Sequence, residues 1–395
     1  MSSPNEDWEN YEVYTGLALG ALGVGLGAAL YARRGPAPQA LERDLVGKSY
    51  VVTGANVGIG KATAAALVAR GGKVILGCRD VAAGQVASRE ILKALPEAEP
   101  SNIEVAQLDL ASFRSIESFA ETVKASPLLG GKSLTCLVNN AGAMVPTFSL
   151  SHTGAGQGAD DGAGLEKTML TNFLGPLHLT KCLESALTRG SRSCSSGSSS
   201  SSSGGSPSRV VNVSSRLEKQ CQLSDEALAA GPTGALAVGQ QYGMTTAYAD
   251  SKHAFLLASL GLARQQQQGY GNSSSRSSSS SSPYVVHSVT PGMVNTNLSR
   301  FLRPPLSWLA WPLQRLLLRT PEQGAAPVVY AATAAQPGLL AESGKYYASD
   351  KAGVCTAIAG SERTGNAQLA AKVLESSLGV IAAARKAETA KVVAE

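Results

Sequence analysis

A tyrosine and a lysine lie four residues apart in Tyr248-Ala-Asp-Ser-Lys252. At the start of a helix, residues at this spacing share one face, with roughly 5–6 Å between their Cβ atoms, so the ammonium can act on the phenol. A nearby positive charge lowers the pKa of a phenol and suits it to proton transfer. Tyr347-Ala-Ser-Asp-Lys351 has the same spacing, so the neighbouring sequence has to decide between the two pairs.

A run of glycines is the second feature that could serve chemistry. An apolar strand expected at 48–53 leads into Gly54-Ala-Asn-Val-Gly58-Ile-Gly60, and a helix of small residues is expected at 61–70. These glycines allow a tight turn and let backbone N–H groups approach a pyrophosphate at the helix N-terminus, where the dipole favours anions. Because strand, turn and helix occur in this order, we favour a dinucleotide site over a glycine turn with a structural role alone.

The end of the next strand bears on the choice of cofactor. The strand expected at 73–78 ends in Gly77-Cys78-Arg79-Asp80. NAD-preferring folds place an acidic residue here for the ribose 2′-OH, whereas a nearby arginine accommodates the 2′-phosphate of NADP. Cys78 occupies the position of the acid and Arg79 follows it; Asp80 competes, but it suits better the N-cap of the helix at 81–95. We therefore expect NADPH rather than NADH.

Strands and helices alternate along the chain, and this order determines which residues come together. Further strands are expected at 103–108, 134–138, 209–215 and 284–290, and helices at 112–124, 166–188 and 248–265. The alternation predicts an α/β fold, a doubly wound parallel Rossmann sheet of about seven strands in a single domain. Ligands bind at the carboxyl ends of the strands in such a sheet, so the residues after each strand should form one site.

The remaining segments are expected to lie outside this domain or on its surface. Residues 1–34 are interpreted as a polar tail and a membrane anchor, 35–44 as a Gly/Pro linker, 45–378 as the Rossmann domain and 379–395 as a C-terminal tail. Two serine-rich tracts, 191–208 and 272–282, lack the apolar residues needed to fold, so we expect disordered loops at the edge of the sheet opposite the ligand.

The anchor is inferred from the stretch 15–32, which has no charged residue and is followed by Arg33-Arg34. Eighteen residues are close to the lower limit for a helix that crosses a bilayer. Aromatic residues flank the stretch, and the arginines predict a single-pass anchor with the following domain on the cytosolic or stromal side. The acidic N-terminus argues against a transit or signal peptide. The alternative is an Ala/Gly-rich helix that does not span.

The overall composition argues against two other classes of site. The chain has 395 residues, 16% of them charged, and a net charge of +5 without a stripe of Lys and Arg, which argues against binding of nucleic acid. Its six cysteines form no CxxC pair and have no histidine at metal-ligand spacing. We expect structural thiols and no metal site.

With these motifs in order, residues 45–378 resemble the short-chain dehydrogenase/reductase family, and within it the membrane-anchored, retinol-dehydrogenase-like branch. The matching residues are TGxxxGxG at 53–60, Asp109, the NNAG run at 139–142, Asn172, Ser215, Tyr248 with Lys252, and Pro291-Gly292 with Thr296. Ser215 is expected rather than Ser214 because it stands three residues after Asn212. The second pair, Tyr347 and Lys351, lies in a last short strand and turn and is not expected to be catalytic.

The resemblance implies carbonyl reduction or its reverse, with Asn172, Ser215, Tyr248 and Lys252 as the catalytic residues. Tyr248 would protonate the developing alkoxide, Lys252 would lower the phenol pKa and bind the ribose hydroxyls, Ser215 would bind the substrate oxygen, and Asn172 would hold a water that links Lys252 to solvent. In the family, Asp109 contacts adenine, Asn140 supports the cofactor and Thr296 holds the nicotinamide carboxamide. The expected NADP(H)-binding set is Gly54, Asn56, Gly58, Ile59, Gly60, Arg79, Asp109, Leu110, Asn140, Ala141, Gly142, Tyr248, Lys252, Pro291, Gly292 and Thr296.

An apolar substrate is expected, such as a retinoid, prenol, steroid or fatty aldehyde, because the apolar segment 301–318 would cover a cleft close to the membrane. The segment could equally be a hydrophobic lid alone. Expected partners are the membrane, through residues 15–32, and either a second copy or a membrane complex, in the endoplasmic reticulum or an organelle envelope. Two rival functions stay open: an NADPH-sensing subunit of a complex such as a plastid protein-import machine, and a light-dependent pigment reductase.

Overall fold

The computed structural model describes residues 44–151, 165–188, 207–231, 242–271, 284–294, 318–334, 342–349 and 354–394. Several predictions concern residues outside these ranges. They are the anchor at 15–32, Thr296, Lys351, the apolar segment up to residue 317, the serine-rich tract 191–208 apart from residues 207 and 208, and all of the tract 272–282. The structure does not test them, and they stay predictions.

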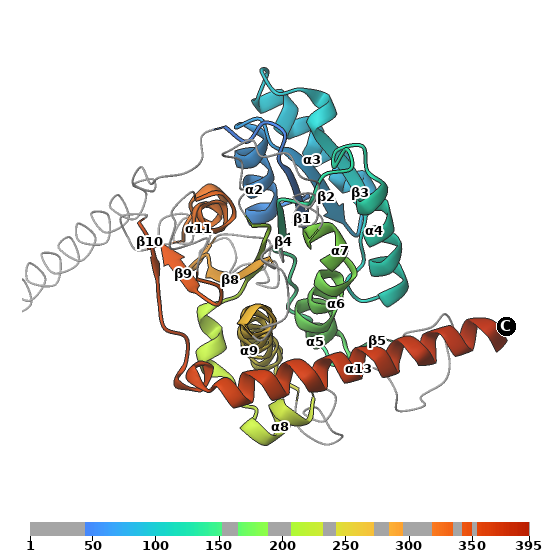
Figure 1. The fold of residues 1–395 in the computed structure, drawn as a ribbon, viewed down its shortest axis with the longest axis vertical. Helices are drawn as coiled ribbons and strands as arrows, with labels where there is room; N and C mark the ends of the chain where they lie inside the picture. Colours follow the sequence, from blue (N-terminus) through green and yellow to red (C-terminus); the bar gives the residue numbers. More distant parts are fainter. Residues whose placement is uncertain are drawn as a thin grey trace, which may run out of the picture.

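A sheet of eight strands lies at the centre of the described fold, in the order β10-β9-β8-β7-β4-β1-β2-β3 (Figure 1). Its strands from β1 to β9 run parallel, and β10 pairs antiparallel with β9 at one edge. The parallel, doubly wound sheet of about seven strands is thus confirmed, and β10 is an addition. The strands are β1 Ser49–Thr53, β2 Lys73–Cys78, β3 Ile103–Gln107, β4 Cys136–Asn139, β7 Arg209–Val213, β8 Val285–Thr290, β9 Tyr346–Ser349 and β10 Cys355–Ala357.

The central strands form because their sequences are apolar on both faces. All five residues of β1 and of β7 are buried, as expected for a parallel sheet covered by helices on each side. From β1 the chain continues to β2 and β3 toward one edge of the sheet. It then returns to β4 on the other side of β1 and continues toward the opposite edge, so the direction of winding reverses between β1 and β4. In open α/β sheets ligands bind outside the carboxyl ends of the strands at such a point.

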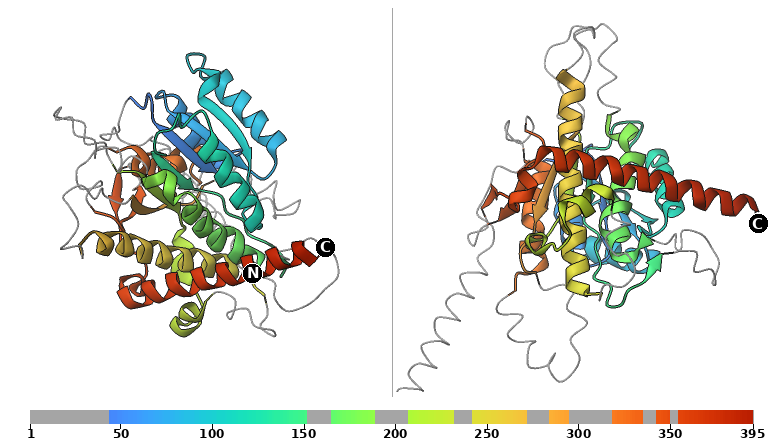
Figure 2. Two further views of the ribbon diagram at one scale, coloured as in Figure 1. Left: turned by 45° about the vertical axis from the view of Figure 1, so that its right-hand side comes forward. Right: turned by 90° about the horizontal axis from the view of Figure 1, so that it is seen from below.

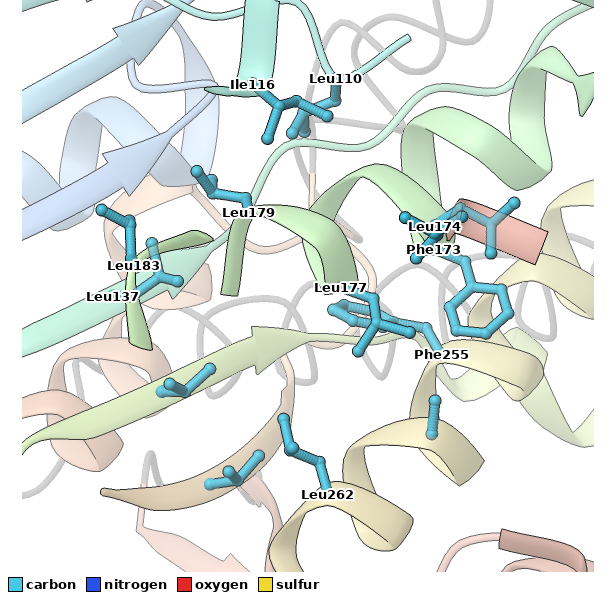
Figure 3. Close-up of a cluster of buried hydrophobic side chains, with 14 of the residues drawn as sticks. Leu110, Ile116, Leu137, Phe173, Leu174, Leu177, Leu179, Leu183, Phe255 and Leu262 are labelled. Atoms are coloured by element: carbon cyan, nitrogen blue, oxygen red, sulfur yellow. The ribbon is translucent and has the colours of Figure 1, made fainter. Parts of the chain in front are cut away.

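Two layers of helices cover the sheet. Helices α2 (Gly58–Val68), α3 (Val81–Ala94) and α11 (Pro321–Thr333) belong to one face, and α4 (Phe113–Ala125), α6 (Gly175–Cys182) and α9 (Met244–Gly271) to the other (Figure 1). Figure 3 shows the apolar core under the second layer, where the rings of Phe173 and Phe255 are 6.1 Å apart. This core fixes α9, which carries the Tyr248/Lys252 pair, against the sheet.

The helix expected at 166–188 is present, but it begins one residue later and is divided into several segments. Leu165–Glu166 forms a short strand β6 with β5 (Leu150–Ser151), and the helix is divided into α5 (Lys167–Met169), a π-helical segment η2 (Leu170–Leu174), α6 and α7 (Glu184–Thr188). Glu166 caps the start because its carboxylate accepts bonds from the backbone N–H groups of Thr168 and Met169. Backbone contacts constrain the middle, since a Cβ on Gly175 would lie 2.3 Å from the Leu110 carbonyl oxygen.

The expectation that Tyr248 opens its helix is also wrong. Helix α9 begins at Met244, and the backbone N–H of Ala247 already donates to the Gly243 carbonyl at 2.8 Å. Threonines at 245 and 246 have low helix propensity, which concealed this first turn in the sequence. Tyr248 and Lys252 therefore both lie inside the helix, where backbone hydrogen bonds on each side fix their positions.

A long C-terminal helix, α13 (Ala367–Ala394), crosses α9 (Figure 2). The two backbones are close, since a Cβ on Gly261 would lie 2.4 Å from the Ala370 carbonyl oxygen. Among the described residues, Ala367–Glu388 is the one stretch long and apolar enough to cross a membrane, but its buried side includes Leu369, Val373 and Ile381. Packing on the domain accounts for that apolar side. The expected domain boundary at residue 378 falls within this helix.

Candidate active site

The residues predicted to bind the cofactor lie after successive strands, at the carboxyl edge of the sheet. The structure brings together the segments that follow β1, β2, β3, β4, β7 and β8. They carry in turn Gly54 to Gly60, Arg79, Asp109 with Leu110, Asn140 to Gly142, Ser215, and Pro291 with Gly292. Of the predicted set, Thr296 alone is outside the described residues.

The glycine loop after β1 leaves the N-terminus of α2 open for an anion. Gly54 and Gly58 have positive φ, 63° and 60°, which glycine adopts without strain. Val57 precedes the helix without a side-chain cap, and the first turn has no acidic residue. Uncapped N–H groups and the helix dipole then favour a phosphate at this end. A Cβ on Gly60 would lie 2.4 Å from the Gly54 carbonyl oxygen, so the loop closes tightly only with glycine.

The turn after β4 is hydrogen-bonded to the residue that begins the glycine loop. Asn140 Nδ2 donates to the Thr53 carbonyl at 2.9 Å, and the backbone N–H groups of Asn140 and Ala141 both donate to Thr53 Oγ1 at 3.0 Å. A Cβ on Gly54 would lie 3.0 Å from Ala141. Asn140 therefore holds the loop that would hold the cofactor, as the resemblance implies. Thr53 was expected as the last strand residue and the first of the TGxxxGxG run, without a role of its own; its hydroxyl accepts the bonds that join the two turns.

The end of β2 carries Cys78, Arg79 and Asp80, the residues from which the cofactor preference was predicted. Burial raises the pKa of the Cys78 thiol to about 11, and the backbone N–H groups of Ala55 and Asn56 hydrogen-bond it. Asp80 Oδ1 accepts a bond from the backbone N–H of Ala83 at 3.0 Å, which confirms Asp80 as the N-cap of α3. Its carboxylate is thus committed to the helix, while Arg79 is exposed beside the glycine loop.

The segments after β3 and β8 are held by local hydrogen bonds. Asp109 Oδ1 accepts from the backbone N–H of Ala111 at 2.9 Å, and Leu110 is buried. After β8, Gly292 has φ of 79°, and the Arg319 guanidinium donates to the Pro291 carbonyl and to the carbonyl of Ser349. Arg319 had no motif in the sequence to mark it, because its contacts with Pro291 and Ser349 arise only in the fold.

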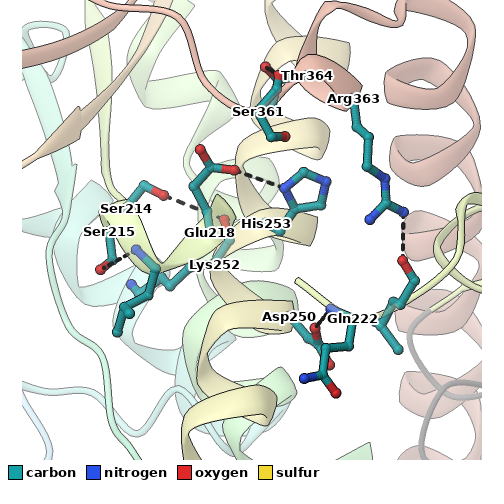
Figure 4. Close-up of polar contacts among 12 residues, drawn as sticks. Ser214, Ser215, Glu218, Gln222, Asp250, Lys252, His253, Ser361, Arg363 and Thr364 are labelled. Atoms are coloured by element: carbon teal, nitrogen blue, oxygen red, sulfur yellow. Dashed lines mark hydrogen bonds and ion pairs between the residues drawn. The ribbon is translucent and has the colours of Figure 1, made fainter. Parts of the chain in front are cut away.

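Ser215 and Tyr248 meet at the carboxyl end of β7. Ser215 follows the strand, and its side chain hydrogen-bonds the Tyr248 phenol. Ser214 lies on the other side, with its hydroxyl 3.5 Å from the Lys252 carbonyl oxygen (Figure 4). Of the two serines, Ser215 is the one that acts on the Tyr248 phenol in this structure, and its catalytic role stays a prediction.

Burial controls the proton affinity of Tyr248 in the ligand-free protein. Tyr248 is 8% exposed, and desolvation raises the pKa of its phenol to about 12, while the bond with Ser215 lowers it. The phenol therefore holds its proton at neutral pH, as a proton donor must. Lys252 is not among the causes of this shift, so its expected lowering of the phenol pKa stays a prediction.

Lys252 is buried under the tyrosine and touches the strand. Its Nζ donates to the Val213 carbonyl at 2.8 Å and lies 5.7 Å from the centroid of the Tyr248 ring. Burial without a carboxylate partner lowers the pKa of Lys252 from 10.5 to about 8. A Cβ on Gly142 would lie 3.2 Å from Nζ, so the lysine reaches the turn after β4 as well.

Asn172 links the turn after β4 to helix α9. Its Oδ1 accepts from the backbone N–H of Ala143 at 2.7 Å, and its Nδ2 donates to the Ala143 carbonyl and to Ser251 Oγ at 2.8 and 3.1 Å. Asn172 lies in the π-helical segment η2, and such segments are frequent at functional sites because they interrupt regular backbone bonding. The side chain is thus engaged, and the predicted water would have to bind the backbone.

The second tyrosine is part of the apolar packing. Tyr347 lies in β9, is 6% exposed, and its ring packs against His287 and Tyr330 at 5.5 and 5.9 Å between centroids. A strand alternates its side chains between faces, so Tyr347 lacks the one-sided arrangement that a helix gives Tyr248 and Lys252. Lys351 lies outside the described residues.

Comparisons with known proteins agree with this arrangement. A family model described as short chain dehydrogenase matches residues 48–221. Retinol dehydrogenase 14 of Mus musculus is 31% identical over 351 residues, which cover 84% of this chain and 89% of the mouse protein. Retinol dehydrogenase 12 of Homo sapiens is 33% identical over 308 residues, which cover 78% and 79%.

The solved structures show the same fold. A Pseudomonas aeruginosa RhlG/NADP active-site complex matches with a TM-score of 0.52 and 21% identity, over 80% of this chain and 100% of that chain. Combined with the identity to the retinol dehydrogenases, the match extends over most of the chain. The protein belongs to the short-chain dehydrogenase family and, within it, to the retinol-dehydrogenase-like members.

Proposed function

We propose that this protein is an NADP(H)-dependent oxidoreductase that interconverts a carbonyl and an alcohol on an apolar substrate, with Tyr248 as proton donor and acceptor. One observation carries the proposal: the buried Lys252 Nζ lies 5.7 Å from the centroid of the Tyr248 ring and donates to the Val213 carbonyl, at the sheet edge that also holds Ser215 and the glycine loop. A proton donor, an activating cation and a dinucleotide cradle are the groups that reversible carbonyl reduction needs.

Each side chain has a distinct task in this proposal. NADPH, when bound, supplies the hydride. Tyr248 gives its proton to the oxygen of the developing alkoxide, and Ser215 holds that oxygen by a hydrogen bond. Lys252 stabilises the phenolate left behind and would bind the ribose hydroxyls. Asn172 keeps Ala143 and the turn after β4 in place, and the backbone of its π-helical segment would take the water that returns a proton through Lys252.

The residues that would hold the cofactor fit its charges. The open N-terminus of α2 suits the pyrophosphate, and the exposed Arg79 suits a 2′-phosphate because Cys78 offers no carboxylate and Asp80 is used as a helix cap. RhlG, whose solved complex contains NADP, has the same fold. Asp109 and Leu110 would border the adenine, and Pro291, Gly292 and Thr296 the nicotinamide.

Replacement of Arg79 tests the preference for NADP. We expect Arg79→Ala to raise the dissociation constant for NADPH by about 10- to 100-fold, since a charged hydrogen bond is worth roughly 1.5–3 kcal/mol, and to leave NADH binding unchanged. Fluorescence titration with both cofactors measures this. Arg89→Ala, an exposed arginine on α3, is the matched control. Equal weakening of NADPH and NADH by Arg79→Ala would contradict the assignment.

The substrate is apolar, and two exposed side chains near the site support this proposal. Phe148, in the loop that follows the β4 turn, is 47% exposed, and Met293, directly after Gly292, is 72% exposed. Single exposed apolar side chains are common on proteins, so the likeness to retinol dehydrogenases carries this part of the proposal and the two residues agree with it. Retinoids, prenols, steroids and fatty aldehydes fit this description. An anchor at residues 15–32 would bring such a site to a membrane where these substrates dissolve.

A substrate panel tests the proposed activity. Full-length protein in detergent is assayed with retinoid, prenol, steroid and fatty aldehydes or alcohols, following NADPH absorbance in both directions. We expect turnover of at least one class, faster with NADPH than with NADH. NADPH binding without any turnover, together with a stable membrane-bound partner, would point instead to the NADPH-sensing role. Turnover only under illumination would point to pigment reduction.

A further inference from the structure

Glu218 and His253 form a buried pair directly behind the catalytic group (Figure 4). His253 Nδ1 and Glu218 Oε2 are 2.9 Å apart, and both side chains are fully buried. Glu218 Oε1 and His253 Nε2 have no hydrogen-bond partner within the described part of the chain. Burying a carboxylate and an imidazole is unfavourable when each has one polar atom without a hydrogen bond. Apolar packing alone therefore does not explain why these two residues are here.

The pair joins the two elements that carry the reaction. Glu218 is in the short 3-10 helix η5 (Arg216–Gln220), which begins immediately after Ser215. Its backbone N–H donates to the Ser215 carbonyl at 3.0 Å. His253 directly follows Lys252 on α9 and lies five residues beyond Tyr248. One end of the contact is therefore fixed to the serine and the other to the tyrosine and lysine.

Other charged and titratable groups surround the pair. Asp250 faces His253 from α9, and Tyr346 faces Glu218 from β9 with Arg216 nearby. Asp250 Oδ1 also accepts from the backbone N–H of Gln222 at 2.8 Å, so the segment after Ser215 is attached to α9 at a second point. The Gln222 bond attaches the segment beyond η5 to α9, whereas the Glu218–His253 contact attaches η5 itself, three residues from Ser215.

We propose that Glu218 and His253 are positioning residues that hold Ser215 against the Tyr248 phenol. An apolar pair of the same size would pack η5 on α9 as tightly, and replacing buried ion pairs in this way is often neutral for stability. A hydrogen-bonded pair differs in being directional, and it sets the separation and register of the two elements. The kinetic part of this inference rests on the proposed oxidoreductase function, whereas its geometric part does not.

Three variants separate positioning from packing. Glu218→Leu/His253→Leu removes both polar groups and keeps the volume apolar. We expect it to fold, to bind NADPH with little change and to lose roughly 10- to 100-fold in kcat, because a misplacement of about 1 Å at a reacting group has an effect of that size. Glu218→Gln keeps a hydrogen bond to the imidazole and should retain kcat within about threefold. Glu218→Met/His253→Phe is a second apolar replacement, used if the leucine variant does not fold.

A control variant addresses stability, and a structural measurement addresses geometry. Tyr284→Phe removes the bond from the Tyr284 hydroxyl to Glu184 at the opposite edge of the sheet, and it should lower Tm without changing kcat. Crystal structures of the wild type and the apolar variant give the Ser215 Oγ to Tyr248 Oη distance, which we expect to lengthen in the variant.

The outcomes distinguish the two proposals. A wild type inactive on the whole substrate panel defeats the proposed function, and the Ser215–Tyr248 distance then decides the role of the pair. An apolar variant with wild-type kcat, or with an unchanged Ser215–Tyr248 distance, overturns the positioning role. So does a Glu218→Gln variant as slow as the apolar one. Failure of both apolar variants to fold would assign the pair to folding instead and would overturn it too.

Discussion

Tyr248→Phe is expected to lower kcat by about 10²- to 10⁴-fold while NADPH still binds. The phenylalanine ring fills the same buried position on α9, so the helix and the core under it should be preserved. The hydroxyl lost is the one that hydrogen-bonds Ser215, and burial that raises its pKa to about 12 keeps it protonated at neutral pH. Without it, the proposed site has no proton donor for the alkoxide. Single-turnover absorbance of NADPH and a separate binding titration measure the two quantities.

Tyr347→Phe is the matched control for this variant. Tyr347 is also buried and is also followed four residues later by a lysine, but it packs against His287 and Tyr330 in β9. Its replacement should leave kcat close to that of the wild type. If Tyr248→Phe retained turnover, or if Tyr347→Phe lost as much, the assignment of the proton donor would be wrong.

The parallel, doubly wound sheet could be predicted because the alternation of strands and helices depends on local sequence. Apolar runs such as Tyr50-Val51-Val52 between glycine turns and helical segments allow few arrangements other than a parallel sheet. Once that sheet is given, the residues after each strand must meet at one edge. Gly54, Arg79, Asp109, Asn140, Ser215 and Pro291 therefore fall together, as expected from sequence alone.

The features that could not be predicted depend on contacts between distant segments. The start of the helix after Glu166 depends on the cap that its carboxylate makes, and the π-helical segment Leu170–Leu174 ends where Gly175 closely approaches the Leu110 carbonyl. The raised pKa of Tyr248 depends on how much of the core covers it, which residue spacing does not report. Glu218 and His253 lie 35 residues apart and belong to no motif, so only the fold brings them into contact.

Lys252 places a charge in the core, and this has an effect on stability that its replacement should expose. Burial lowers the pKa of Lys252 from 10.5 to about 8, which corresponds to about 3 kcal/mol. Below pH ~8 both the folded and the unfolded chain hold the proton, so the folded state has the full unfavourable energy of the buried charge. Between pH ~8 and ~10.5 this lysine binds a proton in the unfolded chain more often than in the folded one, so the unfavourable contribution of Lys252 to stability is lost as the pH rises.

Lys252→Met is therefore expected to lower kcat by about 100-fold or more and yet to be at least as stable as the wild type at pH 7. The loss of the bond to the Val213 carbonyl offsets part of the gain from removing the charge. The change with pH is the sharper test. Between pH 7 and pH 10.5, the free energy of unfolding of the wild type should rise by up to about 3 kcal/mol relative to that of the variant.

Urea unfolding of both ligand-free proteins across this pH range measures the difference, and Lys372→Met, an exposed lysine on α13, is the control that should run parallel to the wild type. If Lys252→Met also ran parallel to the wild type, the lysine would not lose its proton in the folded state within this range. The opposing effects on turnover and stability would have one cause, because the burial that places the ammonium beneath Tyr248 also makes its charge unfavourable for folding.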